Sequence, residues 1–300
     1  MRRLLVALGL VAVTVAVAAA TLTRGGSSAK LFQPPVLGGQ PPGAVVLSRQ
    51  DRDLAVALAV KPLAGRTLLV ATVLAPDGEG ASGLPVRFRV AGSEAAAERG
   101  ASGTYAAILP VRRPGRIVWV SLGKTDRLAF RLPAFWPPRS GRGELVEAAH
   151  AYRDLRTLVI HERLDSAPGV GLSSVYRAAA PDRLSITSSN GNRSIVIGGR
   201  RWDRHAGVGW QQSDQEPPLD PLTPFWHGIV EDPTILGYAT VHGRRLVRLS
   251  FAAPQMPAFF ELTVDETDHR PRQLEMIAAA HFMHHVYSGF DRAVSITPPD

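Results

Sequence analysis

Cysteine is absent from this chain of 300 residues. Its absence excludes disulfides, thiolate metal sites, cysteine nucleophiles and lipid attachment through an N-terminal cysteine. Lysine is almost absent as well, so the net charge of +8 is carried by arginine. With 45% hydrophobic and 20% charged residues, the composition is that of a globular protein and excludes general disorder, a collagen-like chain or a polytopic membrane protein. The length suggests two domains.

Long apolar runs are missing except at the N-terminus. There, Arg2 and Arg3 precede an apolar run from Leu4 to Leu22 that contains three alanines ending at Ala20. This layout predicts a secretory signal cleaved near Ala20. Because a bilayer-spanning helix needs roughly 20 apolar residues, an uncleaved signal-anchor over residues 1–22 is the alternative. In both cases the rest of the chain is exported, since the two arginines stay inside.

Residues 23–43 are rich in Gly, Ser and Pro and predict a linker. From residue 44 to residue 133 the pattern changes to short apolar segments separated by turns, which predicts an Ig-like β-sandwich. The expected strands are Val45–Ser48, Leu54–Val60, Thr67–Leu74, Val86–Val90, Gly103–Leu109, Ile117–Leu122 and Leu128–Leu132.

Residues 134–142 form a Pro-rich strap after this sandwich. Pro137 and Pro138 restrict the chain to extended conformations, so the strap should be short and stiff. Its aromatic residues, Phe135 and Trp136, are expected to dock between the two domains. In the alternative, both cap the sandwich core and the domains move freely.

In residues 143–300, one helix followed by a run of antiparallel strands predicts an α+β domain. Together with the β-sandwich before it, this domain makes the expected chain mainly β. Leu145, Ala148, Tyr152, Leu155 and Val159 recur at helical spacing, which predicts a helix within 143–164. Antiparallel strands are expected to follow at Ser173–Ala179, Arg183–Ser188, Arg193–Ile197, Arg200–His205, Gly209–Gln212, Gly237–Val241, Arg244–Phe251, Phe259–Val264 and Pro271–Ala279, with a last segment at Phe282–Ile296.

Charge is distributed unevenly between these regions. Residues 31–135 carry a net charge of +6, and residues 136–300 carry −2. The positive part could be attracted to anionic lipid head groups, or it could reflect solvated arginines at strand edges. A nucleic-acid partner is not expected, because an exported chain without a basic block lacks the usual electrostatic footprint.

The amino-acid sequence of the second domain resembles that of a known family. The segments that carry this resemblance are Val175–Leu184, Ser194–Trp202, Gly209–Gln211 and Met276–Pro299. They are similar to the LolA/LolB lipoprotein-carrier fold and its LppX/LprG-type relatives. The resemblance implies a half-open antiparallel β-barrel with a helical lid, whose concave face holds acyl chains. Unlike the anchored relatives, this chain has no cysteine for lipid attachment.

The first domain resembles, more weakly, the YtkA-like Ig-like sandwiches associated with CopC/CopD copper-resistance proteins. The segments that carry this similarity are Leu54–Pro62, Val70–Leu74, Leu84–Phe88, Gly103–Ala107 and Pro114–Trp119. A copper site does not follow from it, because residues 31–149 contain no His, Met or Cys, the ligands that copper prefers.

Large apolar side chains on a curved sheet can line a hydrophobic cavity. The candidate lining residues are Ile186, Ile195, Ile197, Trp202, Trp210, Phe225, Trp226, Leu249, Phe251, Phe259, Leu262 and Met276. In the alternative, they form a packed core. The Pro-rich segment 217–227 is a candidate lid or partner surface.

All nine histidines follow residue 149, and the one local cluster is His281, Met283, His284 and His285. On a strand, His281, Met283 and His285 share a face, whereas on a helix His281, His284 and His285 do. Imidazole and thioether could bind copper, or imidazoles could bind zinc with His161 or His269 as a further ligand. In the alternative, His281 fills a strand position while His284 and His285 are surface residues, and no metal or cofactor is bound.

No catalytic residues are expected. The chain has no G-x-S-x-G motif, and its adjacent carboxylates stand in turn contexts. The sequence therefore predicts a non-enzymatic, extracytoplasmic carrier or sensor of a lipid-like or other hydrophobic ligand. The alternative is an interaction module in envelope metal homeostasis that partners a CopD-like membrane protein.

Overall fold

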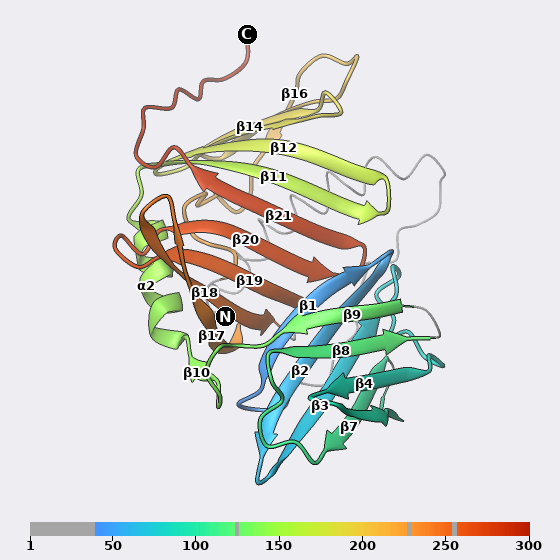
Figure 1. Cartoon of the computed structure of the whole chain (residues 1–300). Helices are drawn as coiled ribbons and strands as arrows, with labels where there is room; N and C mark the ends of the chain where they lie inside the picture. The colour runs from blue at the N-terminus through green and yellow to red at the C-terminus, as the bar shows by residue number, and fades with distance from the viewer. Residues whose placement is uncertain (1–39, 102, 124–125, 227–229, 254–256) are drawn as a thin grey trace.

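The computed structural model describes residues 40–300, apart from residues 102, 124–125, 227–229 and 254–256 (Figure 1). The expected signal segment, 1–22, and most of the expected linker lie outside this range. Within it, no helix is both long enough and apolar enough to cross a bilayer.

The N-terminal part is two antiparallel sheets packed face to face, which we call the sandwich. One sheet has the strand order β1-β2-β3-β7-β6 and the other β5-β4-β8-β9. Their bounds are β1 Val45–Asp51, β2 Leu54–Leu63, β3 Arg66–Leu74, β4 Val86–Val90, β5 Ser93–Ala96, β6 Glu98–Arg99, β7 Thr104–Leu109, β8 Ile117–Leu122 and β9 Asp126–Arg131. Alternate residues of both sheets, such as Leu58, Phe88 and Phe130, fill the interior. Every strand expected here is present, and β5 and β6 are additional.

The remaining strands form one sheet of 12 strands, which we call the large sheet. Its order is β10-β17-β18-β19-β20-β21-β11-β12-β13-β14-β15-β16. The bounds are β10 Arg139–Ser140, β11 Thr157–Ala167, β12 Val170–Ala179, β13 Arg183–Ser188, β14 Arg193–Ile197, β15 Arg200–Arg204, β16 Gln211–Asp214, β17 Glu231–Val241, β18 Arg244–Ala253, β19 Ala258–Asp265, β20 Pro271–Ala278 and β21 His281–Ser288. The end strands β10 and β16 do not pair with each other, so the sheet curves without closing (Figure 1). The prediction of a mainly β chain with a half-open antiparallel barrel is confirmed.

The expected helix is shorter than its periodicity indicated. Helix α2 spans Arg142–Arg153, and the chain then enters β11 at Thr157. The apolar residues of β11 alternate with polar ones, so that Leu158, Ile160 and Leu164 are buried on one face. Val159 satisfied the helical spacing by coincidence, and a period of two describes this segment better.

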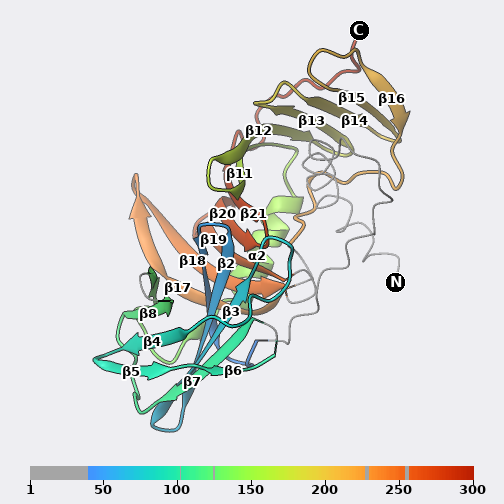
Figure 2. The ribbon, with the colours of Figure 1, turned by 90° about the vertical axis from the view of Figure 1, so that its right-hand side faces the viewer.

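Strand β2 lies between two hydrophobic layers. Val56, Leu58 and Val60 point into the sandwich, whereas Ala55, Ala57 and Ala59 point toward the large sheet. Small alanine side chains allow the two sheets to approach closely, and the strand is buried on both faces. The sandwich is therefore fixed against one face of the large sheet, where β1 and β2 lie beside β18–β20 (Figures 1 and 2).

An ion-pair network crosses the same contact. Arg49 Nη1 of β1 lies 3.2 Å from Glu261 Oε1 of β19, and Arg248 Nη2 of β18 lies 2.7 Å from Glu261 Oε2. Glu261 thus joins the sandwich to the large sheet through two arginines. Ion pairs that are partly shielded from water are screened less by salt than exposed pairs. This network therefore helps to fix the orientation of the sandwich on the large sheet, in addition to the apolar contact.

Candidate functional site

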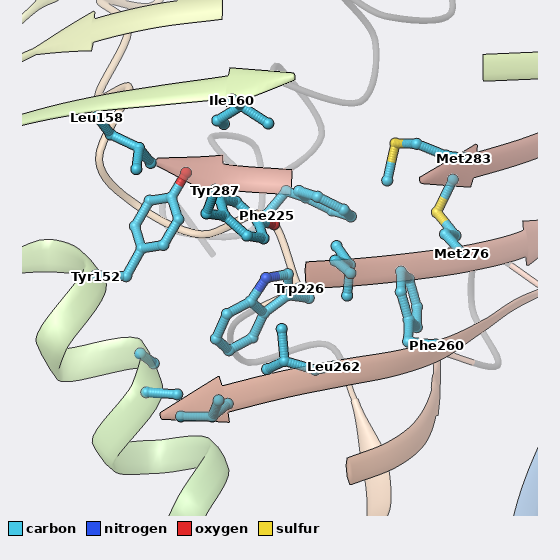
Figure 3. Close-up of a cluster of buried hydrophobic side chains, with 14 of the residues drawn as sticks. Tyr152, Leu158, Ile160, Phe225, Trp226, Phe260, Leu262, Met276, Met283 and Tyr287 are labelled. Carbon is cyan, nitrogen blue, oxygen red and sulfur yellow. The ribbon is translucent and has the colours of Figure 1, made fainter. Parts of the chain in front are cut away.

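The large sheet has two faces with different neighbours. We call the face that packs against α2 the inner face, and the face that packs in part against the sandwich the outer face. Strand alternation puts Ile160, Leu249, Phe260 and Leu262 on the inner face, in the largest hydrophobic cluster of the described chain. Side chains of helix α2 and of a loop lie over this apolar face (Figure 3).

Helix α2 covers one side of the inner face. Its buried residues are Leu145, Ala148, Ala149 and Tyr152, at the spacing of one helical face. The ring of Tyr152 meets the ring of Tyr287 from β21 edge to face, with centroids 6.0 Å apart. The helix thus closes the sheet on this side, as a helical lid would.

Two aromatic residues of an irregular loop cover the centre of the inner face (Figure 3). Phe225 and Trp226 belong to the Pro-rich segment between β16 and β17, and Trp226 is only 1% exposed. The ring of Phe225 lies 6.1 Å from that of Phe260, and the ring of Trp226 lies 6.2 Å from that of Phe251. We call Phe225 and Trp226 the aromatic plug.

The space left beneath the plug is small. A cavity of about 40 Å³ remains, and it is lined by Tyr152, Ile160, Glu162, Tyr176, Pro224, Phe225, Trp226, Met276, His281, Met283, His285 and Tyr287. Binding pockets for organic ligands usually have roughly 300–1,000 Å³. The inner face is therefore packed in this conformation, and the alternative of a filled core describes its present state.

A hydrogen-bonded polar cluster lies within this apolar surrounding. Glu162 Oε2 lies 2.8 Å from His285 Nε2, and the hydroxyl of Tyr176 donates to Glu162 Oε1 at 2.8 Å. Glu162 and His285 are only 4% and 7% exposed. Burying a carboxylate and an imidazole is costly unless both are hydrogen-bonded, so this cluster is a specific feature of the inner face.

Burial sets the protonation of the other polar groups around the cavity. It raises the pKa of the Tyr152 and Tyr287 hydroxyls well above the ordinary value, with nearby acidic and phenolic groups adding to the effect. It lowers the pKa of His281 below its ordinary value, against the attraction of Glu162. The phenols are therefore protonated, and the His281 imidazole is neutral at neutral pH.

The structure brings seven of the expected lining residues to the inner face. These are Ile186, Phe225, Trp226, Leu249, Phe251, Leu262 and Met276. All seven are buried against other side chains rather than exposed to a large cavity.

Five expected lining residues lie elsewhere. Ile195, Ile197 and Trp202 are on the outer face, because Val196 and its register partner Leu184 take the inner positions of these strands. Trp210 lies just before β16, with the guanidinium of Arg204 5.3 Å from its ring centre. Phe259 packs against the sandwich, since its neighbours Ala258 and Phe260 face inward.

The histidine cluster is divided by the alternation of β21. His281, Met283 and His285 line the cavity, as the spacing predicts for a strand, whereas His284 faces a groove on the outer face. His161 lies in that same groove, and His269 lies 3.9 Å from Glu144 of α2. Neither supplies the further metal ligand that was considered. Among the described residues, no three His, Cys, Asp or Glu side chains are grouped as they would be around a metal ion.

The sequence analysis did not find Glu162, Tyr176 or Tyr287. Glu162 occupies an inward position in the alternation Leu158, Ile160, Glu162, Leu164, and a polar residue in such a place is a signal that could have been used. Its partner His285 is 123 positions away in the chain. The two residues meet because β11 and β21 are neighbouring strands, which local sequence patterns do not indicate.

No family model matches this chain, and no curated protein sequence is similar to it. Solved structures that resemble it in fold include the following two. LprF from Mycobacterium bovis is 14% identical, with 53% of this chain and 96% of that chain covered and a TM-score of 0.40. The lipoprotein LppX from Mycobacterium tuberculosis is 12% identical, with 52% and 97% covered and a TM-score of 0.40. No comparison bears on the Ig-like resemblance of the sandwich.

Proposed function

We propose that the large sheet binds a hydrophobic ligand on its inner face, and that the protein is a non-enzymatic carrier or sensor of this ligand outside the cytoplasm. The observation that carries this proposal is the aromatic plug. The centre of an apolar, curved sheet is filled by Phe225 and Trp226 from an irregular loop, in the place that a ligand would take.

The plug can leave without breaking the sheet. Neither Phe225 nor Trp226 belongs to a strand, so their displacement leaves every strand pairing of the large sheet intact. What remains is a floor formed by Phe251, Phe260 and Leu262, all at most 1% exposed while the plug is in place. That floor is apolar and would be unfavourable in water, which favours replacement of the plug by another apolar group.

The free energies of burial indicate what kind of ligand can displace the aromatic plug. Exposing a buried aromatic side chain costs about 1.5–3 kcal/mol, and burying a methylene group contributes about 0.8 kcal/mol. Displacing two aromatics therefore requires on the order of four to eight buried methylene groups. A long alkyl or acyl chain satisfies this condition, whereas a small apolar molecule does not.

The polar cluster supports binding rather than catalysis. Hydroxyl groups of tyrosine, not of serine or threonine, contact the Glu162–His285 pair, at 2.8 Å for Tyr176 and 3.5 Å for Tyr287. Burial raises the pKa of Tyr287, which makes its hydroxyl a poor nucleophile. Export, the membrane anchor and a CopD-like partner stay predictions.

The test is titration of the purified chain with cis-parinaric acid, a fluorescent fatty acid. The Phe225→Ala/Trp226→Ala variant should bind this probe more tightly than the unchanged protein, by about tenfold or more, because the plug no longer has to be displaced. Trp119→Ala is the matched control, since Trp119 lies exposed on the sandwich. Native mass spectrometry of protein from its own host should also detect a bound lipid. No probe binding by either protein, together with no lipid from the host, would overturn the proposal.

A further inference from the structure

Two of the four methionines of the chain meet beneath the aromatic plug. Met276 of β20 and Met283 of β21 are register partners on neighbouring strands. Both side chains point to the inner face, both are 5% exposed, and both line the small cavity. Figure 3 shows the two thioether side chains next to each other.

His281 adds an imidazole to the same cavity. It lies two residues before Met283 on β21, so both side chains project from the same face. His285 is different, because its Nε2 is held by Glu162 Oε2. The His281 side chain forms no hydrogen bond with the part of the chain that the structure describes.

Thioether and imidazole groups together select a soft ion. Thioethers favour Cu(I), whereas Zn(II) and the harder ions prefer imidazole, thiolate or carboxylate sets. No such harder set is present among the described residues. The cavity of about 40 Å³ has space for an ion beside the three donor groups.

We propose that Met276, Met283 and His281 form a Cu(I)-binding site on the inner face of the large sheet. Phe225 lines the same cavity, and an apolar surrounding favours the singly charged, reduced ion over Cu(II). The proposal does not rest on the carrier function, because it uses atoms of the sheet itself and needs the aromatic plug in place. A lipid requires the opposite, that the plug is displaced.

The alternative explanation is that the methionines only fill the core, as flexible thioethers often do. Leucine has nearly the same volume and no sulfur, so Met276→Leu and Met283→Leu keep the packing and remove the donor atoms. His284→Ala is the matched control for His281→Ala, since His284 lies on the same strand but faces outward.

The experiment is anaerobic titration of the purified chain with Cu(I) in competition with bicinchoninate. The unchanged protein and His284→Ala should bind one Cu(I), and X-ray absorption should detect sulfur neighbours of the copper. Met276→Leu, Met283→Leu and His281→Ala should each weaken binding at least about tenfold. The proposal is overturned if the unchanged protein does not compete for Cu(I), or if both leucine variants bind it as the unchanged protein does.

A second readout separates a loss of donor atoms from a loss of fold. The leucine variants should keep the circular dichroism and the urea-unfolding midpoint of the unchanged protein, because leucine fills nearly the same volume. Loss of Cu(I) binding with folding intact shows that the donors act specifically. The carrier function is tested separately, by the cis-parinaric acid titration of the Phe225→Ala/Trp226→Ala variant.

Discussion

Phe135 and Trp136 are adjacent in the chain, yet they pack against different hydrophobic cores. Phe135 lies against the core of the large sheet, with the guanidinium of Arg139 4.5 Å from its ring centre. Trp136 lies against the core of the sandwich, in a cluster that also includes Leu236 of β17. The strap therefore carries one aromatic anchor for each side, in agreement with the expectation that both residues dock between the two parts of the molecule.

This arrangement predicts that Trp136→Ala weakens the contact between the sandwich and the large sheet. We expect the free energy of unfolding to fall by about 1–3 kcal/mol, and small-angle scattering of residues 40–300 to show a broader distribution of interdomain distances. Trp119→Ala removes an exposed tryptophan of the sandwich and should change neither. Identical scattering of the two variants would contradict this prediction, and would mean that β1 and β2 alone hold the sandwich against the large sheet.

The alanine face of β2 makes a second prediction. Ala57 is 1% exposed and belongs to the cluster that contains Phe259 and Phe282 of the large sheet. Ala57→Leu inserts a larger side chain between the two layers and should destabilise the protein by about 1–3 kcal/mol. The comparison is Ala129→Leu on the exposed side of β9, which should have little effect. Equal stability of the two variants in urea unfolding would mean that the layers do not pack as described.

Local patterns in the sequence were sufficient to find most strands. Val86–Val90, Ile117–Leu122 and Arg183–Ser188 were predicted with the bounds that the structure has. In Val86–Val90 and Arg183–Ser188 apolar residues alternate with polar ones, whereas Ile117–Leu122 is a short, mostly apolar run. Turn residues follow each strand, so the signal lies within a few residues. The start of β11 was missed, because its apolar residues continued a helical period by coincidence.

Which face a residue occupies was much harder to predict than the strand itself. Ile195 and Ile197 are larger than Ser194, yet Ser194 points inward with Val196. Hydrophobicity alone could not choose between the two faces, because the outer face of this sheet is also partly covered. The same reason applies to Phe259, whose apolar neighbours come from the sandwich. The Glu162–His285 pair depends on strand order, which a single sequence does not give.

Asp265 makes the stability sensitive to acid. Burial tends to raise the pKa of this carboxyl, but hydrogen bonds from Arg244, the Thr267 amide and Arg272 outweigh it and lower the pKa from 3.8 to about 2. Because the folded pKa is below the unfolded one, the stabilisation is present above about pH 4 and is lost as the pH falls toward 2. At neutral pH it amounts to about 2 kcal/mol.

Asp265→Asn should therefore destabilise the protein by about 2 kcal/mol at neutral pH. The difference from the unchanged protein should become smaller in urea unfolding below about pH 3. Asp53→Asn, in an exposed turn, serves as the control and should show little difference at either pH. A difference for Asp265→Asn that stays constant between neutral and acidic pH would contradict the assignment.

The buried pair of Glu162 and His285 predicts non-additive effects of substitution. Removing one partner leaves the other buried without its hydrogen bond at 2.8 Å, and such single substitutions usually cost about 3–5 kcal/mol. We expect this cost for Glu162→Leu and for His285→Leu. In the double variant no unpaired polar group remains from the pair, and apolar replacements of buried ion pairs are often neutral or stabilising.

The double variant should thus be more stable than either single variant, by about 2 kcal/mol or more. Tyr176→Phe tests the edge of the same cluster, since it removes the hydroxyl that donates to Glu162 and keeps the ring. Its cost should be smaller, about 1–2 kcal/mol. Additive losses in the Glu162→Leu and His285→Leu cycle would show that the two side chains are stabilised separately. Recovery in the double variant would mean that the pair is not needed for folding, and that its presence on an apolar face has to be explained by what that face binds.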